Sequence, residues 1–434
     1  MRVRLRRCTC KDISVSLSDP QSIVDRLRQF QRLVRDTVIR SRRSAGDVGL
    51  HEVSRSSAAD TIYKIDTEVD PILEQFCRDW GRETPLVLIA EGMEDENGIE
   101  GPVVFPHGTH EENAHIRVIV DPIDGTRGIM YDKRAAWALA GVALNKGPGT
   151  RLSDIEVAVM TELPTSKMGY VDVLWAIKGR GASGMRERLE PQKAVLELAD
   201  SSRNVPIGRV LTELGKVTND KVIEALNTQR RNGGMVGQIL VGMGYVNQKD
   251  VQIALAFQKG DKPQLSPELM SVMSAESLKL RPSQAETINH GFATVSNFFP
   301  GTKVLASELM EHLVRNLIGP ADVKQATVFD DQYISTGGQF YELIMGHDRF
   351  NADLRPAFYQ LQGQPEGLCC HPYDCATMLI AEEAGVRITG PNGQPLDGPM
   401  DTTTGLSWIG YANASLQRKI EPLVIDFLRN RSQA

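Results

Sequence analysis

The chain lacks both a long apolar segment and a strong net charge. Its 434 residues are 41% hydrophobic and 24% charged, with a formal net charge of -6 at neutral pH. No stretch approaches the roughly 18 consecutive apolar residues of a membrane-spanning helix, which predicts a protein that is not embedded in a membrane. A weakly acidic chain also lacks the basic surface that displaces counterions from nucleic acid, so a nucleic-acid partner is not expected.

Cysteine is scarce, and its spacing excludes two kinds of site. The six cysteines show neither a disulfide framework nor paired Cys-x-x-Cys zinc motifs. We interpret them as reduced thiols of a cytoplasmic protein. They are Cys8, Cys10, Cys77, Cys369, Cys370 and Cys375.

One region departs from the average charge. Residues 1–45 hold twelve Arg or Lys and four Asp, and we interpret residues 1–18 as a basic N-terminal tail. Such runs are usually solvated, and an arm for an anionic partner is the alternative. No apolar core follows the tail, so a secretory signal is not expected.

Apolar periodicity predicts mixed helices and strands in the first half of the chain. Apolar residues at helical spacing follow Asp19-Pro20, which predicts a long amphipathic helix. A second helical segment is expected around residues 66–80. The apolar runs 86–90 and 117–120 are typical of buried strands, and they finish on Glu91 and Asp121.

A repeat of 29 residues marks residues 205–262. Each copy predicts a short helix that ends at a glycine with left-handed backbone, followed by a longer helix. Such a period is typical of a unit that buries its apolar face against its copy. We therefore predict a helical module inserted between two parts of one domain, residues 19–204 and 263–434. The matched positions are Gly208 with Gly237, Leu214-Gly215 with Met243-Gly244, Ala225-Leu226 with Ala254-Leu255, and Gln229 with Gln258.

The last third returns to mixed structure. A helical pattern follows Gly337-Gly338, and a second one follows Asp374, which places this carboxylate near a helix N-terminus. Residues 386–389 and the turn at 390–393 predict a terminal hairpin.

The chemistry is concentrated in Asp121-Pro122-Ile123-Asp124-Gly125-Thr126. Two carboxylates that converge at a turn repel each other unless a cation lies between them, and oxygen ligands favour magnesium. If Gly125 and Thr126 start a helix, their N–H groups can hold a phosphate oxygen. Turn formation is the alternative role for the two Asp residues. Glu91 and Asp374 strengthen the prediction of a metal site, because four carboxylates can surround two or three ions.

These residues resemble the signature of the inositol monophosphatase superfamily of lithium-sensitive, magnesium-dependent phosphatases. Residues 121–126 are similar to its central motif, and Ile89-Ala90-Glu91 is similar to its first metal-ligand motif. Residues 371–374 with Ala384-Gly385 resemble the C-terminal motif, and residues 60–66 resemble the stretch whose Asp helps to place a third ion. The resemblance covers roughly residues 20–185 and 275–425.

The resemblance implies an α+β fold with five alternating layers, αβαβα, of the sugar-phosphatase type, here with an inserted small all-helical repeat domain. It implies two or three Mg²⁺ ions and a water that is oriented and deprotonated by Thr126 and Glu91, with Asp121 as a further catalytic residue. The implied metal ligands are Asp66, Glu91, Asp121, the carbonyl of Ile123, Asp124 and Asp374. We expect Gly125, Thr126, Arg127, Gly337 and Gly338 to bind substrate.

Three departures from the family pattern concern the alcohol end of the substrate. Gly92 replaces a frequent second Glu, residues 127–129 stand where inositol phosphatases commonly carry Asn-Phe, and Tyr373 replaces a common Trp. None removes a metal ligand, so we expect direct in-line attack of water on a small phosphorylated metabolite, without a phosphoenzyme. Inositol phosphate, a sugar bisphosphate, 3′-phosphoadenosine phosphate and histidinol phosphate stay open as substrates.

The repeated module resembles the N-terminal domain of type II secretion and pilus-assembly ATPases, some of which bind cyclic di-GMP. The arginine that usually begins each of their motifs is replaced by Pro206 and by Met235, which removes the natural partners of guanine and phosphate. We therefore rank a protein contact or a spacer role ahead of cyclic di-GMP binding.

Two functions of different class remain at this stage. The first is an active phosphatase. The second is a catalytically weak regulatory or scaffold protein that uses the phosphatase fold for binding and the insert to recruit a partner or a cyclic dinucleotide. The retained carboxylates favour the enzyme, and a homodimer is expected by analogy with relatives.

Overall fold

The computed structural model describes residues 17, 19–45, 53–56, 61–93, 101–189, 202, 204–261, 275–320 and 324–433. Most of the predicted basic tail, residues 1–18, lies outside the described residues. So do Cys8, Cys10, Asp60 and most of the two polar segments that flank the repeat. Within the described ranges, no helix has the length and apolar character needed to cross a membrane.

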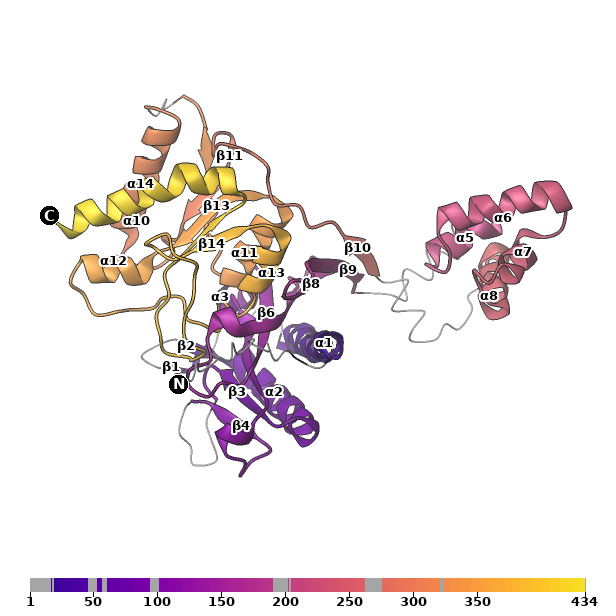
Figure 1. Ribbon diagram of the computed structural model, residues 1–434, viewed down its shortest axis with the longest axis horizontal. Coiled ribbons are helices and arrows are strands. Elements are labelled where there is room, and N and C mark those ends of the chain that lie inside the picture. Colours follow the sequence, from indigo (N-terminus) through magenta and orange to yellow (C-terminus); the bar gives the residue numbers. More distant parts are fainter. Residues whose placement is uncertain are drawn as a thin grey trace, which may run out of the picture.

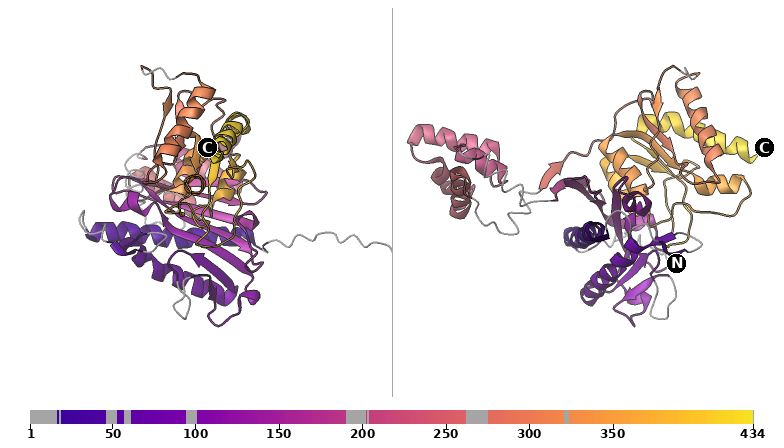
Figure 2. Two further views of the ribbon diagram at one scale, coloured as in Figure 1. Left: turned by 90° about the vertical axis from the view of Figure 1, so that its left-hand side faces the viewer. Right: turned by 180° about the vertical axis from the view of Figure 1, so that it is seen from behind.

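Five alternating layers of helices and sheets form the main body, as the sequence predicts (Figure 1). Two long helices cover the outer face of an eight-stranded sheet, and two shorter helices separate it from a five-stranded sheet. Two more helices cover the far face. Figure 2 shows that the N-terminal elements gather in one half and the C-terminal elements in the other. In layer order, these helices are α1 (Pro20–Ala45) and α2 (Lys64–Glu83), then α11 (Thr336–Met345) and α13 (Met378–Ala384), then α10 (Lys303–Leu317) and α14 (Ala414–Ser432).

The large sheet has the order β10-β9-β8-β7-β6-β5-β3-β4, and the small sheet has the order β12-β11-β13-β15-β14. Strands β1 and β2 pair with each other as a separate two-stranded sheet. Two further short helices are α3 (Thr126–Met130) and α12 (Arg355–Leu361). The strands are β1 (Val53–Ser56), β2 (Thr61–Tyr63), β3 (Leu86–Ala90), β4 (Val103–Phe105), β5 (Ile116–Asp124), β6 (Ala136–Leu144), β7 (Ile155–Leu163), β8 (Tyr170–Ile177), β9 (Ala182–Arg188), β10 (Ala275–Leu278), β11 (Gly291–Val295), β12 (Val328–Phe329), β13 (Asp348–Asp353), β14 (Arg387–Thr389) and β15 (Trp408–Tyr411).

Strand β6 shows how one sequence serves two cores. Successive side chains of a strand point to opposite faces, and both faces of this strand are covered by helices. Small residues on one face let α1 pack closely, and residues of mixed size, from Ala143 to Trp137, occupy the other face toward α11. The first set is Ala136, Ala138, Ala140 and Val142, and the second includes Trp137, Leu139 and Ala143.

The predicted terminal hairpin is wrong in its pairing. Along its length, strand β14 pairs antiparallel with β15, some twenty residues further along the chain, and not with a strand that directly follows the turn. The turn at Gly390 is present, since the Gly393 N–H donates to the Gly390 carbonyl at 3.1 Å, but the pairing across it is limited to one isolated bridge, between Thr389 and Pro395.

The repeat folds into two helical hairpins with one core of their own. Helices α5 (Ile207–Glu213) and α7 (Val236–Gly242) begin 29 residues apart, and so do α6 (Asn219–Asn232) and α8 (Gln248–Lys259). All the buried apolar side chains of this core come from residues 210–257. The period in the sequence is therefore also a period in the helices.

Matched glycines let the helices of each copy approach closely. A Cβ on Gly208 would lie 2.6 Å from a methyl of Val222, and a Cβ on Gly237 would lie 3.0 Å from the equivalent methyl of Val251. The glycines that follow α5 and α7, Gly215 and Gly244, have φ values of 66° and 72°, as predicted for left-handed helix ends.

The repeat is inserted between two paired strands at one edge of the large sheet. Strand β9 precedes it and β10 follows it, and the two pair antiparallel, with Glu187 opposite Ala275. Without the insert, these strands would be joined as an ordinary hairpin. Loop closure depends only weakly on loop length, which explains why the sheet accepts an insert there.

We predict that Gly208→Ala weakens the packing of α5 on α6. The added methyl meets Val222, and overpacking of this kind costs about 1–3 kcal/mol, more than the roughly 1 kcal/mol that alanine gains as a helix former. Amide hydrogen exchange on the full chain should show faster exchange in α5–α8 only. Gly242→Ala is the control because its Cβ would meet nothing within 4 Å, and equal protection in the two variants would contradict the prediction.

Candidate metal centre

Parallel pairing of β3 and β5 places Glu91 beside Asp121. The register sets Ala90 opposite Val120, so the residue after each lies at the same level of the sheet. Both strands are fully buried up to this point. Two buried runs are thus each followed by an acidic residue at the same level of the sheet, as the sequence predicts for Glu91 and Asp121.

A β-bulge turns Asp121 and Asp124 to the same face. Residues three positions apart on a regular strand point to opposite faces. Here Asp121 lies opposite Leu139 and Asp124 lies opposite Trp137. Three residue steps along β5 therefore match two steps along β6, which is a bulge in β5. Strand β5 therefore continues through Asp124, and the expectation that it finishes at Asp121 is wrong.

Asp124 is held by the N-terminus of α11. Its Oδ2 accepts hydrogen bonds from the Ser335 hydroxyl at 2.8 Å and from the Gly337 N–H at 2.6 Å. The Thr336 N–H lies 3.3 Å from Oδ1. These donors fix the carboxylate and favour its charged form, since a helix N-terminus stabilises negative charge.

The glycine pair allows this close contact. A Cβ on Gly337 would lie 2.5 Å from Leu139 and 3.0 Å from Asp124, and a Cβ on Gly338 would lie 2.3 Å from the Tyr333 ring. The Gly338 N–H donates to the Ser335 hydroxyl oxygen at 2.8 Å. Both glycines were predicted to bind substrate, but in the structure their N–H groups are already engaged in positioning Asp124.

Asp374 reaches the same place from the turn that precedes α13. Its Oδ2 accepts the backbone N–H of His371 at 2.6 Å. The turn lies directly against β6, where a Cβ on Gly141 would be 2.7 Å from the Ala376 carbonyl oxygen. The bare glycine face of β6 therefore sets how close Asp374 comes to Asp121.

Thr126 and Asp66 meet at the side of the cluster. The Thr126 hydroxyl is 2.8 Å from the Ile123 carbonyl oxygen and 3.2 Å from Oδ1 of Asp66, in the first turn of α2. Gly125 precedes α3 with a φ of 97°. Side chains there are strained, and a Cβ would approach the Ile334 carbonyl at 3.1 Å, so only glycine fits this position well.

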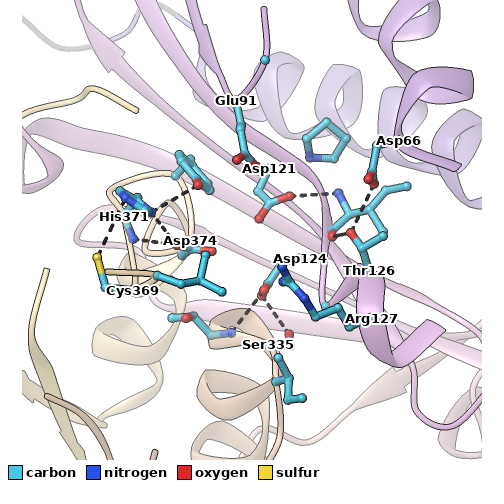
Figure 3. A pocket seen from close by; sticks show the side chains of 18 of the residues that line it. Asp66, Glu91, Asp121, Asp124, Thr126, Arg127, Ser335, Cys369, His371 and Asp374 are labelled. Carbon is cyan, nitrogen blue, oxygen red and sulfur yellow. Dashed lines mark hydrogen bonds and ion pairs between the residues drawn. The ribbon is translucent and has the colours of Figure 1, made fainter. Parts of the chain in front are cut away.

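These side chains surround one cavity of about 120 Å³ (Figure 3). Asp121, Asp124 and Asp374 each offer a carboxylate oxygen within 4.8 Å of the others, the one such group of three or more in the part of the chain that is described. Figure 3 shows Glu91 directed toward the same space from above Asp121. The acidic residues predicted from four separate segments thus gather at one site.

Burial and repulsion raise the proton affinity of this cluster. Burial, followed by the nearby charges of Asp124, Asp374 and Glu91, raises the pKa of Asp121 well above its usual range. Burial and Asp124 raise the pKa of Asp374 in the same way. The pKa of Asp124 is raised by burial to about 6, although its hydrogen bonds to Ser335 and α11 oppose the shift.

The donor set fits divalent cations. Every side chain of the central group offers a hard carboxylate oxygen, which suits Mg²⁺ better than soft metals. A phosphate dianion would be repelled by these carboxylates unless cations offset their charge. The nearby Arg355 does not offset it alone, because its guanidinium pairs with Asp353 at 2.9 Å and donates to the Leu368 carbonyl. The residues present therefore fit bound divalent ions.

Several lining residues escaped the sequence analysis. Asp70 lines the cavity one helical turn after Asp66, and this spacing of four residues on α2 could have revealed it. Ser335 is the N-cap of α11, a role that Ser commonly takes before a helical pattern. No local pattern marks the remaining ones, which are Phe298, Phe299, Ile334, Thr336, Arg355, Leu368 and Cys369.

Comparison with solved structures identifies the fold class. A Leishmania major fructose-1,6-bisphosphatase in its holo form is similar over 95% of this chain and 96% of that chain, with 12% identity and a TM-score of 0.53. Two other similar structures are the Bartonella henselae suhB protein (13% identity, 93% of this chain, 98% of that chain, TM-score 0.49) and a Thermotoga maritima IMPase (12% identity, 94% of this chain, 99% of that chain, TM-score 0.48). The first of these likenesses shows that the chain has the fructose-bisphosphatase type of fold.

At the level of sequence the chain stands apart. It matches no protein-family model and no curated protein. The structural likeness therefore establishes a shared fold, and the chemistry has to be argued from the site itself.

We predict that Mg²⁺ stabilises the protein more at pH 7.5 than at pH 5. Because the folded pKa of Asp124, about 6, lies above its ordinary 3.8, charging this group opposes folding. Stability of the metal-free protein should fall as pH rises from about 4 to 6, and bound Mg²⁺ should restore it above that window. At a hundredfold excess over Kd the gain is about 2.7 kcal/mol.

Thermal denaturation with and without Mg²⁺ tests this. Asp121→Asn should abolish the Mg²⁺-dependent rise in Tm, whereas Asp79→Asn, at an exposed position of α2, should keep it. An equal rise at both pH values would show that the carboxylates do not exchange protons for the ion.

Proposed function

We propose that this protein is a divalent-metal-dependent phosphatase that hydrolyses a small phosphate monoester. The observation that carries this proposal is the meeting of Asp121, Asp124 and Asp374, drawn from distant segments, within 4.8 Å in a cavity that also holds Glu91. A fold needs no such costly cluster for stability, since buried like charges oppose folding. We propose Mg²⁺ as the natural ion, with two or three ions bound.

The metal ligands are proposed to be the residues that face the cavity. When bound, divalent ions would neutralise phosphate charge, lower the pKa of water and stabilise the leaving alkoxide. The proposed ligands are Glu91, Asp121, Asp124, Asp374, the carbonyl of Ile123 and, for a third ion, Asp66.

Thr126 is the proposed residue that orients the attacking water. Its hydroxyl proton can be donated to either the Ile123 carbonyl or Asp66, which leaves oxygen lone pairs to accept an O–H from water. Glu91 lines the same cavity and is the proposed acceptor of the proton that this water releases. Gly125, Thr126 and Arg127, at the start of α3, are proposed to bind the phosphate oxygens.

We also propose that residues 205–262 act as a separate module, placed between the two parts of one domain, residues 19–204 and 263–434. Its own apolar core and its position at a sheet edge support this division. None of its described residues lines the metal cavity. A contact with a protein partner agrees with this placement better than a part in catalysis. The homodimer, the cytoplasmic location and the resemblance of the module to secretion ATPases stay predictions.

We predict that Asp121→Asn or Asp374→Asn lowers Mg²⁺-dependent hydrolysis of 4-nitrophenyl phosphate by at least about a thousandfold, because each removes a charge on which ion binding depends. Near-ultraviolet circular dichroism should show an intact fold, and chelation of the wild-type protein should give the same loss of activity. Asp79→Asn is the matched control. Near-normal activity in either site variant would remove the assignment and favour the scaffold alternative.

We predict that Thr126→Val lowers kcat by about a hundredfold with little change in KM, as expected for a group that positions the nucleophile. Thr126→Ser retains the hydroxyl and should restore most of the rate. Steady-state kinetics at saturating Mg²⁺ distinguish the two variants. A Ser variant as slow as the Val variant would show that packing of the Thr methyl, and not the hydroxyl, matters.

A further inference from the structure

Two adjacent phenylalanines form an aromatic wall on the cavity. Phe298 and Phe299 follow β11 and line the same cavity as the carboxylates. Their ring centroids are 4.9 Å apart, and the rings are nearly perpendicular, at 89°. Both side chains are only partly buried. Large apolar rings beside an acidic site are not needed to hold cations, so they call for a separate explanation.

The wall is fixed by its surroundings. On the N-terminal side, the Ser296 N–H donates to the Ala352 carbonyl at 2.8 Å and the Asn297 N–H donates to Oε1 of Gln332 at 2.8 Å. On the C-terminal side, Gly301 has a φ of 109° and lies close to the Tyr359 ring. The segment is therefore anchored by backbone hydrogen bonds on its N-terminal side, which favours a preformed surface.

Guanidinium groups flank the rings. The Arg355 carbon Cζ lies 4.8 Å from the Phe298 centroid and 5.3 Å from the Phe299 centroid. Arg127, which comes from α3 in the other half of the body, lies 5.2 Å from the Phe299 centroid. The wall thus combines aromatic rings with guanidinium groups, two kinds of group on which planar rings can stack.

Several of the polar groups that line the cavity beside this wall already have partners within the described part of the chain. The hydroxyls of Thr126 and Ser335 lie within hydrogen-bond distance of the Ile123 carbonyl and Asp124, respectively. Arg355 is held by Asp353 and the Leu368 carbonyl. Against the two rings themselves, a hydroxyl of a polyol would find no hydrogen-bond partner, whereas a flat ring would bury apolar surface there.

We propose that Phe298 and Phe299 form the leaving-group subsite and select phosphate monoesters whose leaving group carries a planar aromatic or heteroaromatic ring. This proposal rests on the phosphatase function proposed above. It assigns to the two residues a role in choosing the substrate, and it leaves the hydrolytic chemistry to the acidic cluster.

Binding of three phosphonates tests the subsite without turnover. Methylphosphonate reports the phosphate site alone, and benzylphosphonate and cyclohexylmethylphosphonate add rings of equal carbon number that differ in planarity. In calorimetry with Mg²⁺ and wild-type protein, benzylphosphonate should bind about fivefold more tightly than the cyclohexyl compound, the size expected for one stacking contact. Phe298→Leu and Phe299→Leu should each bring the ratio toward one.

Phe292→Leu is the matched control. This residue lies on β11, is 39% exposed and packs against Phe329, away from the cavity. It should keep the wild-type preference. Equal affinity for the two ring compounds in the wild-type protein, or an unchanged ratio in both subsite variants, overturns the proposal. A uniform loss for all three phosphonates also overturns it, because that loss would lie in the phosphate site.

Kinetics extend the test to catalysis. For 1-naphthyl phosphate, the subsite variants should raise KM at least about fivefold, again the size of a lost stacking contact. For glycerol 2-phosphate, KM should change by less than about twofold. Equal changes for both substrates overturn the proposal. If the wild-type protein hydrolyses neither, the phosphatase function fails, and the phosphonate ratios still decide whether the aromatic subsite exists.

Discussion

Repulsion among buried carboxylates is the constraint on which the rest of this structure depends. Asp121, Asp124 and Asp374 lie so close together that their negative charges repel one another unless a proton or a cation lies between them. Burial adds to the free-energy cost of ionising them. Such a cluster persists only if each member is held by its own support. The β5 bulge directs Asp121 and Asp124 to one side, α11 binds Asp124, and the His371 N–H binds Asp374.

Those supports come from both halves of the body, so the site exists only when the two sheets are docked. Asp121 belongs to the large sheet, whereas the N-terminus of α11 that holds Asp124 belongs to the layer between the sheets. Gly141 and Gly337 allow this close docking because they have no side chain. Each lets backbone or carboxylate approach to about 3 Å or less of where a Cβ would lie. The close packing of the middle layer is therefore a requirement of the chemistry as well as of stability.

Much of this could be predicted from sequence, for local reasons. An apolar run that ends on an acidic residue is visible at Glu91, and the 29-residue period reveals the helical module. The bulge between Asp121 and Asp124 could not be predicted, because it depends on the register against β6. The role of Gly337 was also missed, since its N–H could serve a substrate or a carboxylate equally well until the fold brought Asp124 to it. Phe298 and Phe299 carry no motif, and only tertiary packing places them at the cavity.

The position of the insert separates its role from the chemistry. In the large sheet, β10 and β9 stand at one edge, and β8, β7 and β6 separate them from β5, which carries Asp121. An insertion beside β5 would have disturbed the register that builds the site, whereas one between paired edge strands leaves that register unchanged. A partner bound to the module would have to act on the cavity through those intervening strands, whose faces are packed on both sides. The arrangement is therefore better suited to locating the protein than to altering its metal cavity.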